Sequence, residues 1–141
     1  MSVSSADFLA FATTCNGGGT EINFRNCVSR AYYGVYHAAL PVAVAHCPDP
    51  NANVRMGDHD RLSKRFRASP DKDAQAIGYV LESMKGARHR ADYDIHQTVT
   101  ANDAKQALAN AKTFSGRLAN FAHQAAASGQ IGNVSSIRSA P

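Results

Sequence analysis

The segment Arg88–His96, RHRADYDIH, crowds two arginines, two histidines, two aspartates and a tyrosine into nine positions. A histidine titrates near neutral pH and can move a proton, and the forked guanidinium of an arginine binds phosphate oxygens. These are the groups that metal-independent RNA cleavage requires. One takes the proton from a ribose 2′-hydroxyl, and the other stabilises the charge that builds on the reacting phosphate.

The charge distribution favours an anionic partner. The formal net charge is +4, a mild basic excess that suits nucleic acid. One basic cluster lies at positions 61–67, and a second lies at 85–90, directly before two aspartates. The first cluster alone is equally typical of a solvated helix face. The residues expected to contact RNA are Arg61, Lys64, Arg65, Lys85 and Arg88.

The composition indicates one intracellular domain. With 141 residues, 44% of them hydrophobic, the chain has the size of a single globular core. No apolar run approaches the roughly 18 to 20 residues of a membrane span, and the N-terminus lacks the basic flank of a signal peptide, so we expect a cytoplasmic protein. The three cysteines form no CxxC pair, which favours reduced thiols. No P-loop, GxGxxG or HExxH motif is present, and we expect no cofactor.

Helical periodicity extends over nearly the whole chain, without strand alternation. We therefore expect an all-α fold, an up-and-down bundle of four to five helices whose second, fourth and fifth members are long. The expected helices cover about 5–13, 20–47, 58–66 and 70–94, and a fifth begins near residue 100. Residues 1–127 would form the domain, and the small, polar segment 128–141 would be a flexible tail or be ordered by a partner.

Several residues mark the expected helix ends and the core. The glycine run at 17–19 ends the first helix, and Pro41 is expected to kink the second because it lacks a backbone donor. The expected N-terminal signals are Ser4 or Ser5, Asp58, Ser69 with Pro70, and a capping box of Thr100 with Asp103. The expected core of the last helix is Ala104, Leu108, Ala111, Phe114, Leu118 and Phe121.

Two segments carry a family resemblance. The stretch NFRNCVSRAYYGVYHAA, followed by DHDRL and later by RHRADYD, resembles the HEPN domain family of all-helical proteins. The likeness spans roughly Thr20 to Phe121. It implies a bundle of four or five helices that forms a two-fold homodimer, in agreement with the helix pattern. Many members of this family are ribonucleases of toxin–antitoxin and phage-defence systems.

The resemblance also implies a catalytic pair. Active members carry an arginine followed after four to six residues by a histidine, and Arg90 and His96 fit this pattern. Arg90 would bind phosphate and His96 would act as the acid or base. The chain departs from the family at Ala91, which is often polar, and at Thr98, where one subgroup has a regulatory tyrosine. In the alternative interpretation, Arg90 only pairs with Asp92 or Asp94 and His96 only lies in a loop.

Other residues are expected to support this pair. Arg30, Tyr33 and His37 share one helix face by their spacing, where they would line the same cleft or act as amphipathic core residues. In the family the SRAYY segment packs against the ADYD segment, so Arg30 should meet Asp92 or Asp94. The expected supporting residues are Arg30, Tyr33, His37, Asp92, Tyr93 and Asp94. No metal site is expected, because His59 and its two flanking aspartates point in different directions on a helix.

Two functions remain open at this point. The first is a metal-independent endoribonuclease of HEPN type, a toxin restrained by an antitoxin or a phage-defence protein. The second is a non-catalytic helical module that binds a nucleotide or a nucleotidyltransferase-like partner.

Overall fold

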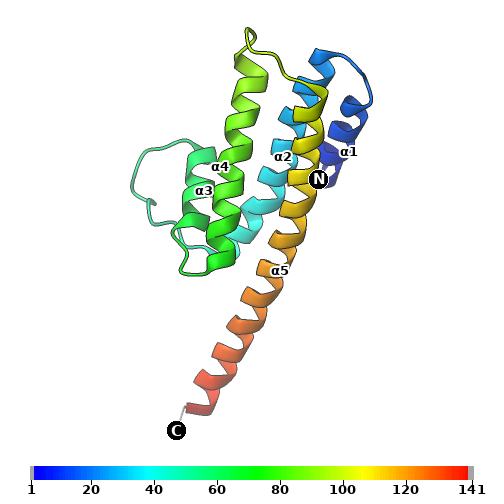
Figure 1. Ribbon diagram of the computed structural model, residues 1–141. Helices are drawn as coiled ribbons and strands as arrows, with labels where there is room; N and C mark the ends of the chain where they lie inside the picture. Colours follow the sequence, from blue (N-terminus) through cyan, green and yellow to red (C-terminus); the bar gives the residue numbers. More distant parts are fainter. Residues whose placement is uncertain (1, 140–141) are drawn as a thin grey trace.

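The computed structural model describes the backbone of residues 2–139 and the side chains of residues 2–129. Residues 2–139 form five α-helices and no β-strand (Figure 1). The helices are α1 (Ser5–Asn16), α2 (Glu21–His46), α3 (Asp58–Arg67), α4 (Lys72–Tyr93) and α5 (Ala101–Ser139). The predicted all-α bundle is confirmed, and α2, α4 and α5 are its long members, as expected.

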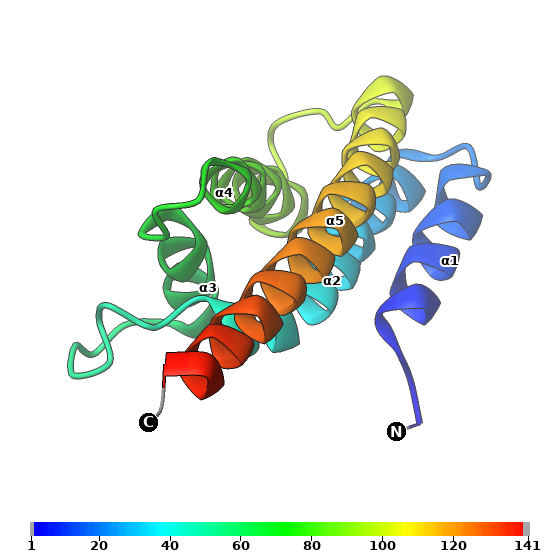
Figure 2. The ribbon, with the colours of Figure 1, turned by 90° about the horizontal axis from the view of Figure 1, so that it is seen from below.

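The central element of the bundle is α2, which packs against α1, α4 and α5, whereas α3 packs mainly on α4. Viewed from below, α1 and α3 lie on opposite sides of the molecule (Figure 2). Small buried residues on α2 allow this crowding. A Cβ at Gly34, for example, would lie 2.6 Å from the side chain of Leu9 in α1.

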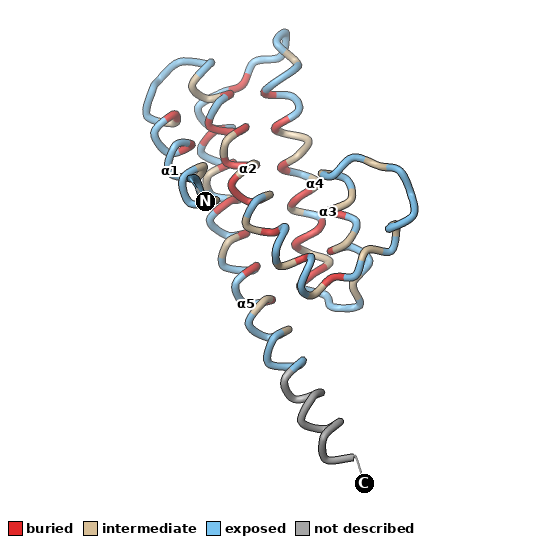
Figure 3. The backbone as a smooth tube through the Cα atoms, turned by 180° about the vertical axis from the view of Figure 1, so that it is seen from behind, coloured by how far each residue is buried: buried red, intermediate tan, exposed pale blue. Residues whose placement is uncertain are grey.

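The core lies where α2, α4 and α5 face one another, and buried positions follow the inner sides of these helices (Figure 3). Its largest buried side chains include Tyr32, Phe66, Ile77, Leu81 and Phe114. The expected core of the last helix is confirmed at five positions: Ala104, Ala111, Phe114, Leu118 and Phe121 are buried. Leu108 is half-buried and packs against the same core.

The expected helix starts are confirmed at α1 and α5. Ser4 is the N-cap of α1, and its N–H donates to the carboxylate of Asp7 over 2.7 Å. At α5 the capping box is reciprocal: the N–H of Thr100 donates to Asp103 over 2.8 Å, and the N–H of Asp103 donates to the Thr100 hydroxyl over 3.1 Å. Both boxes satisfy backbone donors that a helix start leaves free.

Two expected caps were wrong. Asp58 is the first helical residue of α3, and Gly57 occupies the cap position. Asp71, not Ser69, caps α4, because its carboxylate accepts the N–H groups of Asp73 and Ala74 over 2.8 and 3.0 Å. Ser69 instead accepts the N–H of Asp71 and so shapes the turn that precedes the cap.

Two other expectations concern the long helices. α2 continues through Pro41 to His46, and the kink expected at Pro41 stays a prediction. α5 stays helical to Ser139 and extends past the rest of the bundle (Figure 1). The side chains of 130–141, in the expected flexible tail, lie outside the described residues, and mobility of 128–141 stays a prediction. Within the described range, no helix combines the length and apolar character needed to cross a bilayer.

Gly78 marks the closest approach of α3 and α4. A Cβ at this position would lie 2.9 Å from the backbone nitrogen of Arg67 and 3.0 Å from the carbonyl oxygen of Ser63. Since these are backbone atoms of α3, Gly78→Ala should push the helices apart and lower the free energy of unfolding by about 1–3 kcal/mol. Urea unfolding followed by helical circular dichroism measures this change.

Gly116 provides the matched control, because it also lies inside a helix but a Cβ there would meet no described atom within 4 Å. Gly116→Ala should raise the free energy of unfolding by about 0.5–1 kcal/mol through helix propensity alone. Effects of equal sign and size at the two positions would contradict the close α3–α4 contact.

Candidate active site

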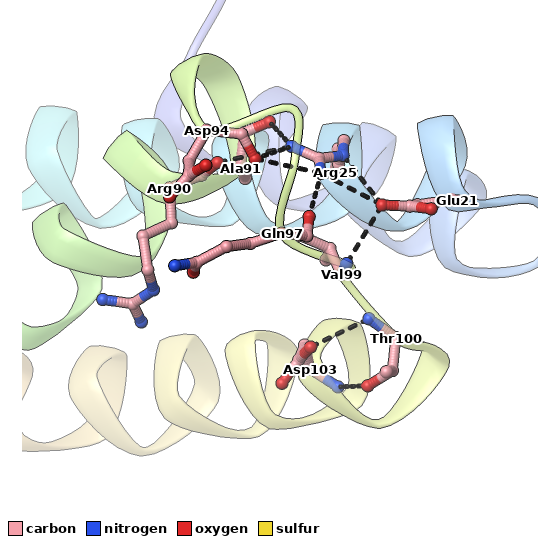
Figure 4. A network of polar contacts seen from close by, with 9 residues as sticks. All are labelled: Glu21, Arg25, Arg90, Ala91, Asp94, Gln97, Val99, Thr100 and Asp103. Atoms are coloured by element: carbon pink, nitrogen blue, oxygen red, sulfur yellow. Dashed lines mark hydrogen bonds and ion pairs between the residues drawn. The ribbon is translucent and has the colours of Figure 1, made fainter.

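A buried arginine of α2 organises the end of α4. Arg25 is 8% exposed, and its guanidinium reaches across to the backbone of the residues that the sequence analysis singled out (Figure 4). It donates to the carbonyl oxygens of Ala91 (2.9 Å), Arg90 (3.3 Å) and Asp94 (3.2 Å). It also donates to the carbonyl oxygen of Gln97 in the following loop. One side chain therefore fixes both the last turn of α4 and the segment that follows it.

Glu21 completes this network from the first turn of α2. Its carboxylate accepts hydrogen bonds from Nε and Nη2 of Arg25 over 3.2 and 3.0 Å, and from the N–H of Val99 over 3.1 Å. The bond from Val99, together with the guanidinium of Arg25, holds the pKa of Glu21 below its ordinary value. The loop between α4 and α5 is thus attached to α2 at both of its ends.

Arg90 and His96 lie within this fixed segment and keep their side chains free. Both are exposed, and neither side chain forms a hydrogen bond or ion pair with another described residue. The side chain of Arg90 points away from Arg25 towards α5 (Figure 4). Among the described residues Arg90 therefore does not pair with Asp92 or Asp94, whereas His96 does lie in a loop, as the alternative interpretation expected.

Arg90 lines a cleft of about 230 Å³, formed by α2, α4, α5 and residues 97–99. His96 lies in the same loop but is not part of the cleft lining. The structure thus brings the two residues onto one fixed segment without placing both in one cleft of a single chain.

The expected contact of Arg30 with Asp92 or Asp94 was wrong, because Arg30 reaches Asp92 only through the Ser29 hydroxyl. The side chain of Arg30 donates to the Ser29 hydroxyl over 3.3 Å, and this hydroxyl donates to the Asp92 carboxylate over 3.1 Å. Arg30 also lies over the ring of Tyr33, 5.0 Å from its centroid. Arg88, one turn before Asp92 on α4, is the nearer cation, at 3.7 Å.

Asp94 contacts Arg25 through its backbone: its carbonyl oxygen, not its carboxylate, accepts the hydrogen bonds from Arg25. The SRAYY and ADYD segments do pack together, as expected. The arginine that binds the second segment is Arg25, and Arg30 reaches Asp92 only through Ser29.

Arg88 lies inside the bundle instead of on its surface. It is 8% exposed, its guanidinium is 5.5 and 5.6 Å from the ring centroids of Tyr32 and Tyr33, and its Nε has no hydrogen-bond partner among the described residues. The aromatic rings and Asp92 compensate the buried charge. Arg88 therefore does not offer its guanidinium to an RNA phosphate, and its role in this structure is to join α4 to α2.

The tyrosine face of α2 is part of the same packing. The hydroxyl of Tyr32 and Nδ1 of His59 are 2.6 Å apart, which ties α2 to α3. Burial, and then the nearby Arg88, lowers the pKa of His59, and burial raises the pKa of Tyr32. Tyr33 is half-buried and packs against the core, His37 is exposed, and neither residue lines the cleft. Among the described residues, no cluster of His, Cys, Asp or Glu could hold a metal ion.

The first basic cluster is mostly engaged within the chain. Arg61 donates to Asp49 over 2.6 Å and to two loop carbonyls over 2.7 Å, and it thereby holds the loop between α2 and α3. Arg65 donates to the carbonyl oxygens of Cys47 and Ala43 at the end of α2. Lys85 pairs with Asp60, and Lys64 is exposed. Of the five residues expected to contact RNA, Lys64 is the one that the described structure leaves exposed and without a partner.

Tyr93 stands out at the end of α4. The residue is 66% exposed, and its ring centroid lies 5.0 Å from that of His89, one turn earlier. Ile95, two residues later, is 73% exposed. Two large exposed side chains therefore lie between Arg90 and His96 in the sequence.

Comparison of the chain with protein-family models, curated proteins and solved structures found no match in any of the three. The HEPN resemblance accordingly rests on the sequence segments described above.

Arg25 was missed by the sequence analysis. Its spacing from Val28 and Tyr32 places it on the buried side of α2, and its spacing from Glu21 favours an ion pair. A cation on an apolar face, with an acidic residue one turn before it, was the available signal. The carbonyl groups that it binds are invisible in a sequence.

Arg25→Met should be strongly destabilising because it leaves several partly buried carbonyl oxygens of α4 and the loop without a donor. We expect the free energy of unfolding to fall by about 2–4 kcal/mol. Amide hydrogen exchange at residues 95–99 should become much faster. Arg55→Met, at an exposed loop position, is the matched control and should change stability by less than about 0.5 kcal/mol. Equal stability of the two variants would contradict the role assigned to Arg25.

Proposed function

We propose that this chain is a metal-independent endoribonuclease of HEPN type that acts as a toxin of a toxin–antitoxin system or as a phage-defence protein. The observation that carries the proposal is that Arg25 fixes the backbone of residues 90–97 at the end of α4. Arg25 binds backbone carbonyl oxygens from Arg90 to Gln97, and it leaves the side chains of Arg90 and His96 exposed and without a partner among the described residues. A rigid backbone with free functional groups is what preorganised catalysis requires.

The reaction follows from these two groups. His96 removes the proton of a ribose 2′-hydroxyl, and the oxygen attacks the adjacent phosphorus. The guanidinium of Arg90 binds the non-bridging oxygens, whose charge increases in the transition state. The bond from phosphorus to the 5′-oxygen breaks, and a protonated histidine gives its proton to this oxygen. The products are a 2′,3′-cyclic phosphate and a 5′-hydroxyl, with no metal and no cofactor consumed.

A homodimer supplies the second proton-transfer group. Residues 90–96 of each chain contain one histidine, His96, whereas the reaction uses one base and one acid. Burial of the exposed Tyr93 and Ile95 against a second copy would bring two Arg90–His96 segments together around one RNA strand. The same assembly explains why Arg90 and His96 do not share a cleft within one chain.

The catalytic pair can be tested with RNA and purified variants. His96→Ala should reduce cleavage of a mixed RNA pool by about a hundredfold or more, because the proton-transfer group is lost. Arg90→Ala should do likewise, and Arg90→Lys should recover little, since an ammonium cannot make the forked contact with phosphate. Thermal unfolding should stay unchanged because both side chains are exposed.

His123→Ala is the matched control for these variants, because His123 is exposed on α5 and should leave cleavage unaltered. All reactions should proceed in EDTA. If the wild-type protein and the alanine variants degrade RNA equally, the activity belongs to a contaminant and the ribonuclease proposal fails.

The dimer can be tested by sedimentation. The wild-type protein should sediment as a dimer at tens of micromolar, and Ile95→Asp should shift it to a monomer that has lost cleavage activity. Val54→Asp replaces another exposed apolar residue, far along the chain in the loop before α3, and should leave the dimer intact. A monomeric wild-type protein that cleaves RNA at full rate would contradict the composite site.

A second candidate function is a non-catalytic module that binds a nucleotide or a nucleotidyltransferase-like partner. The observation that favours it is the cleft beside Arg90, which His96 does not line. Under this alternative the protein binds its ligand, and His96→Ala has no effect on any RNA.

A further inference from the structure

The cleft beside Arg90 has an apolar interior. Its walls include Val28 of α2, Met84 and Ala87 of α4, Val99 of the loop and Ala107 of α5. Four of these side chains, those of Val28, Met84, Val99 and Ala107, are at most 8% exposed. The apolar walls of the cleft therefore belong to the core of the bundle and are not formed by a surface loop alone.

The rim of the cleft is polar but nearly uncharged. Carboxamides come from Gln97, Gln106 and Asn110, and hydroxyls come from Ser83 and Thr98. Asp103 supplies the only carboxylate in the lining, and it already accepts the N–H of Thr100. Arg90 is the only cation in the lining. Such a site suits a neutral ring that carries an anionic group on the side of Arg90.

Two of the carboxamides are oriented by each other. Nε2 of Gln106 donates to Oδ1 of Asn110 over 2.9 Å, across one turn of α5. This bond leaves the carbonyl oxygen of Gln106 as an acceptor and the amide group of Asn110 as a donor. A neighbouring acceptor and donor match the hydrogen-bonding edge of a nucleobase.

We propose that this cleft binds a single nucleobase of the RNA strand, with Gln106 and Asn110 selecting it by its edge and Arg90 holding the adjacent phosphate. Its volume of about 230 Å³ lies below the roughly 300–1,000 Å³ of sites for whole drug-sized ligands. That size fits one base. The inference rests on the proposed function for its choice of RNA as the ligand, and it adds a base-specific subsite that sets the cleavage position.

The first test measures base preference. A synthetic RNA that contains all four bases is cleaved, and the bases next to each cut are counted by sequencing. The wild-type protein should prefer one base, and Asn110→Asp, which turns a donor into an acceptor, should change that preference by about tenfold. Ala107→Leu, which fills the cleft, should remove the preference. Asn120→Asp makes the same charge change at an exposed position of α5 outside the cleft and should keep the wild-type preference.

The second test does not depend on catalysis. The four nucleoside 3′-monophosphates and inorganic phosphate are titrated into His96→Ala protein, and the side-chain amide signals of Gln106 and Asn110 are followed by NMR. One nucleotide should bind more tightly than the others and shift both signals. Inorganic phosphate should leave them unshifted. Equal binding of all four nucleotides and of phosphate, with both signals unmoved, would overturn the base site.

The two tests separate this inference from the proposed function. Base-selective binding in the cleft, without RNA cleavage by the wild-type protein, would contradict the ribonuclease proposal and support the base-specific subsite. Cleavage that needs His96 but has the same base distribution in the wild-type, Asn110→Asp and Ala107→Leu proteins would support the ribonuclease and overturn the subsite.

Discussion

The hydrogen bonds from the Arg25 guanidinium to the end of α4 are the interaction on which the candidate site depends. A helix end leaves its last carbonyl oxygens without intrahelical partners. Arginine carries five N–H donors in a rigid plane and is more weakly hydrated than lysine, so it can satisfy several such oxygens at a modest desolvation cost. Arg25 does this for α4 and the loop together, and the partly exposed Glu21 balances its charge.

This anchoring separates the residues of one short segment by role. Ala91 faces the bundle and is buried, and Asp92 ties α4 to Ser29 of α2. Arg90 and His96 are exposed, and their side chains have no partner among the described residues although their backbone is fixed. The bundle therefore holds the end of α4 rigid while the side chains of Arg90 and His96 stay exposed. The proposed chemistry requires both features.

The arginines show why residue type alone does not reveal a role. Arg25 and Arg88 are both buried, yet Arg25 binds carbonyl oxygens, whereas Arg88 lies among tyrosine rings and its Nε has no partner in the described part of the chain. Arg61 and Arg65 hold loop and helix-end carbonyls. Only Arg90 lines the cleft as an uncommitted cation. A net positive charge thus says little about the binding of an anionic partner, because several of the arginines form contacts within the chain that stabilise the fold.

The sequence by itself determined the helices and their long members, the capping box at Thr100 and the core stripe of α5, because these follow from local periodicity and short-range hydrogen bonds. It also placed Arg90 and His96 next to the end of α4. Only the tertiary structure decided that Arg25, and not Arg30, meets that end. Periodicity gives the face of a helix, but the crossing of α2 and α4 sets which turn of that face lies opposite which carbonyl oxygen. The cleft beside Arg90 depends on the same crossing, since its walls come from three helices and a loop that no local pattern relates.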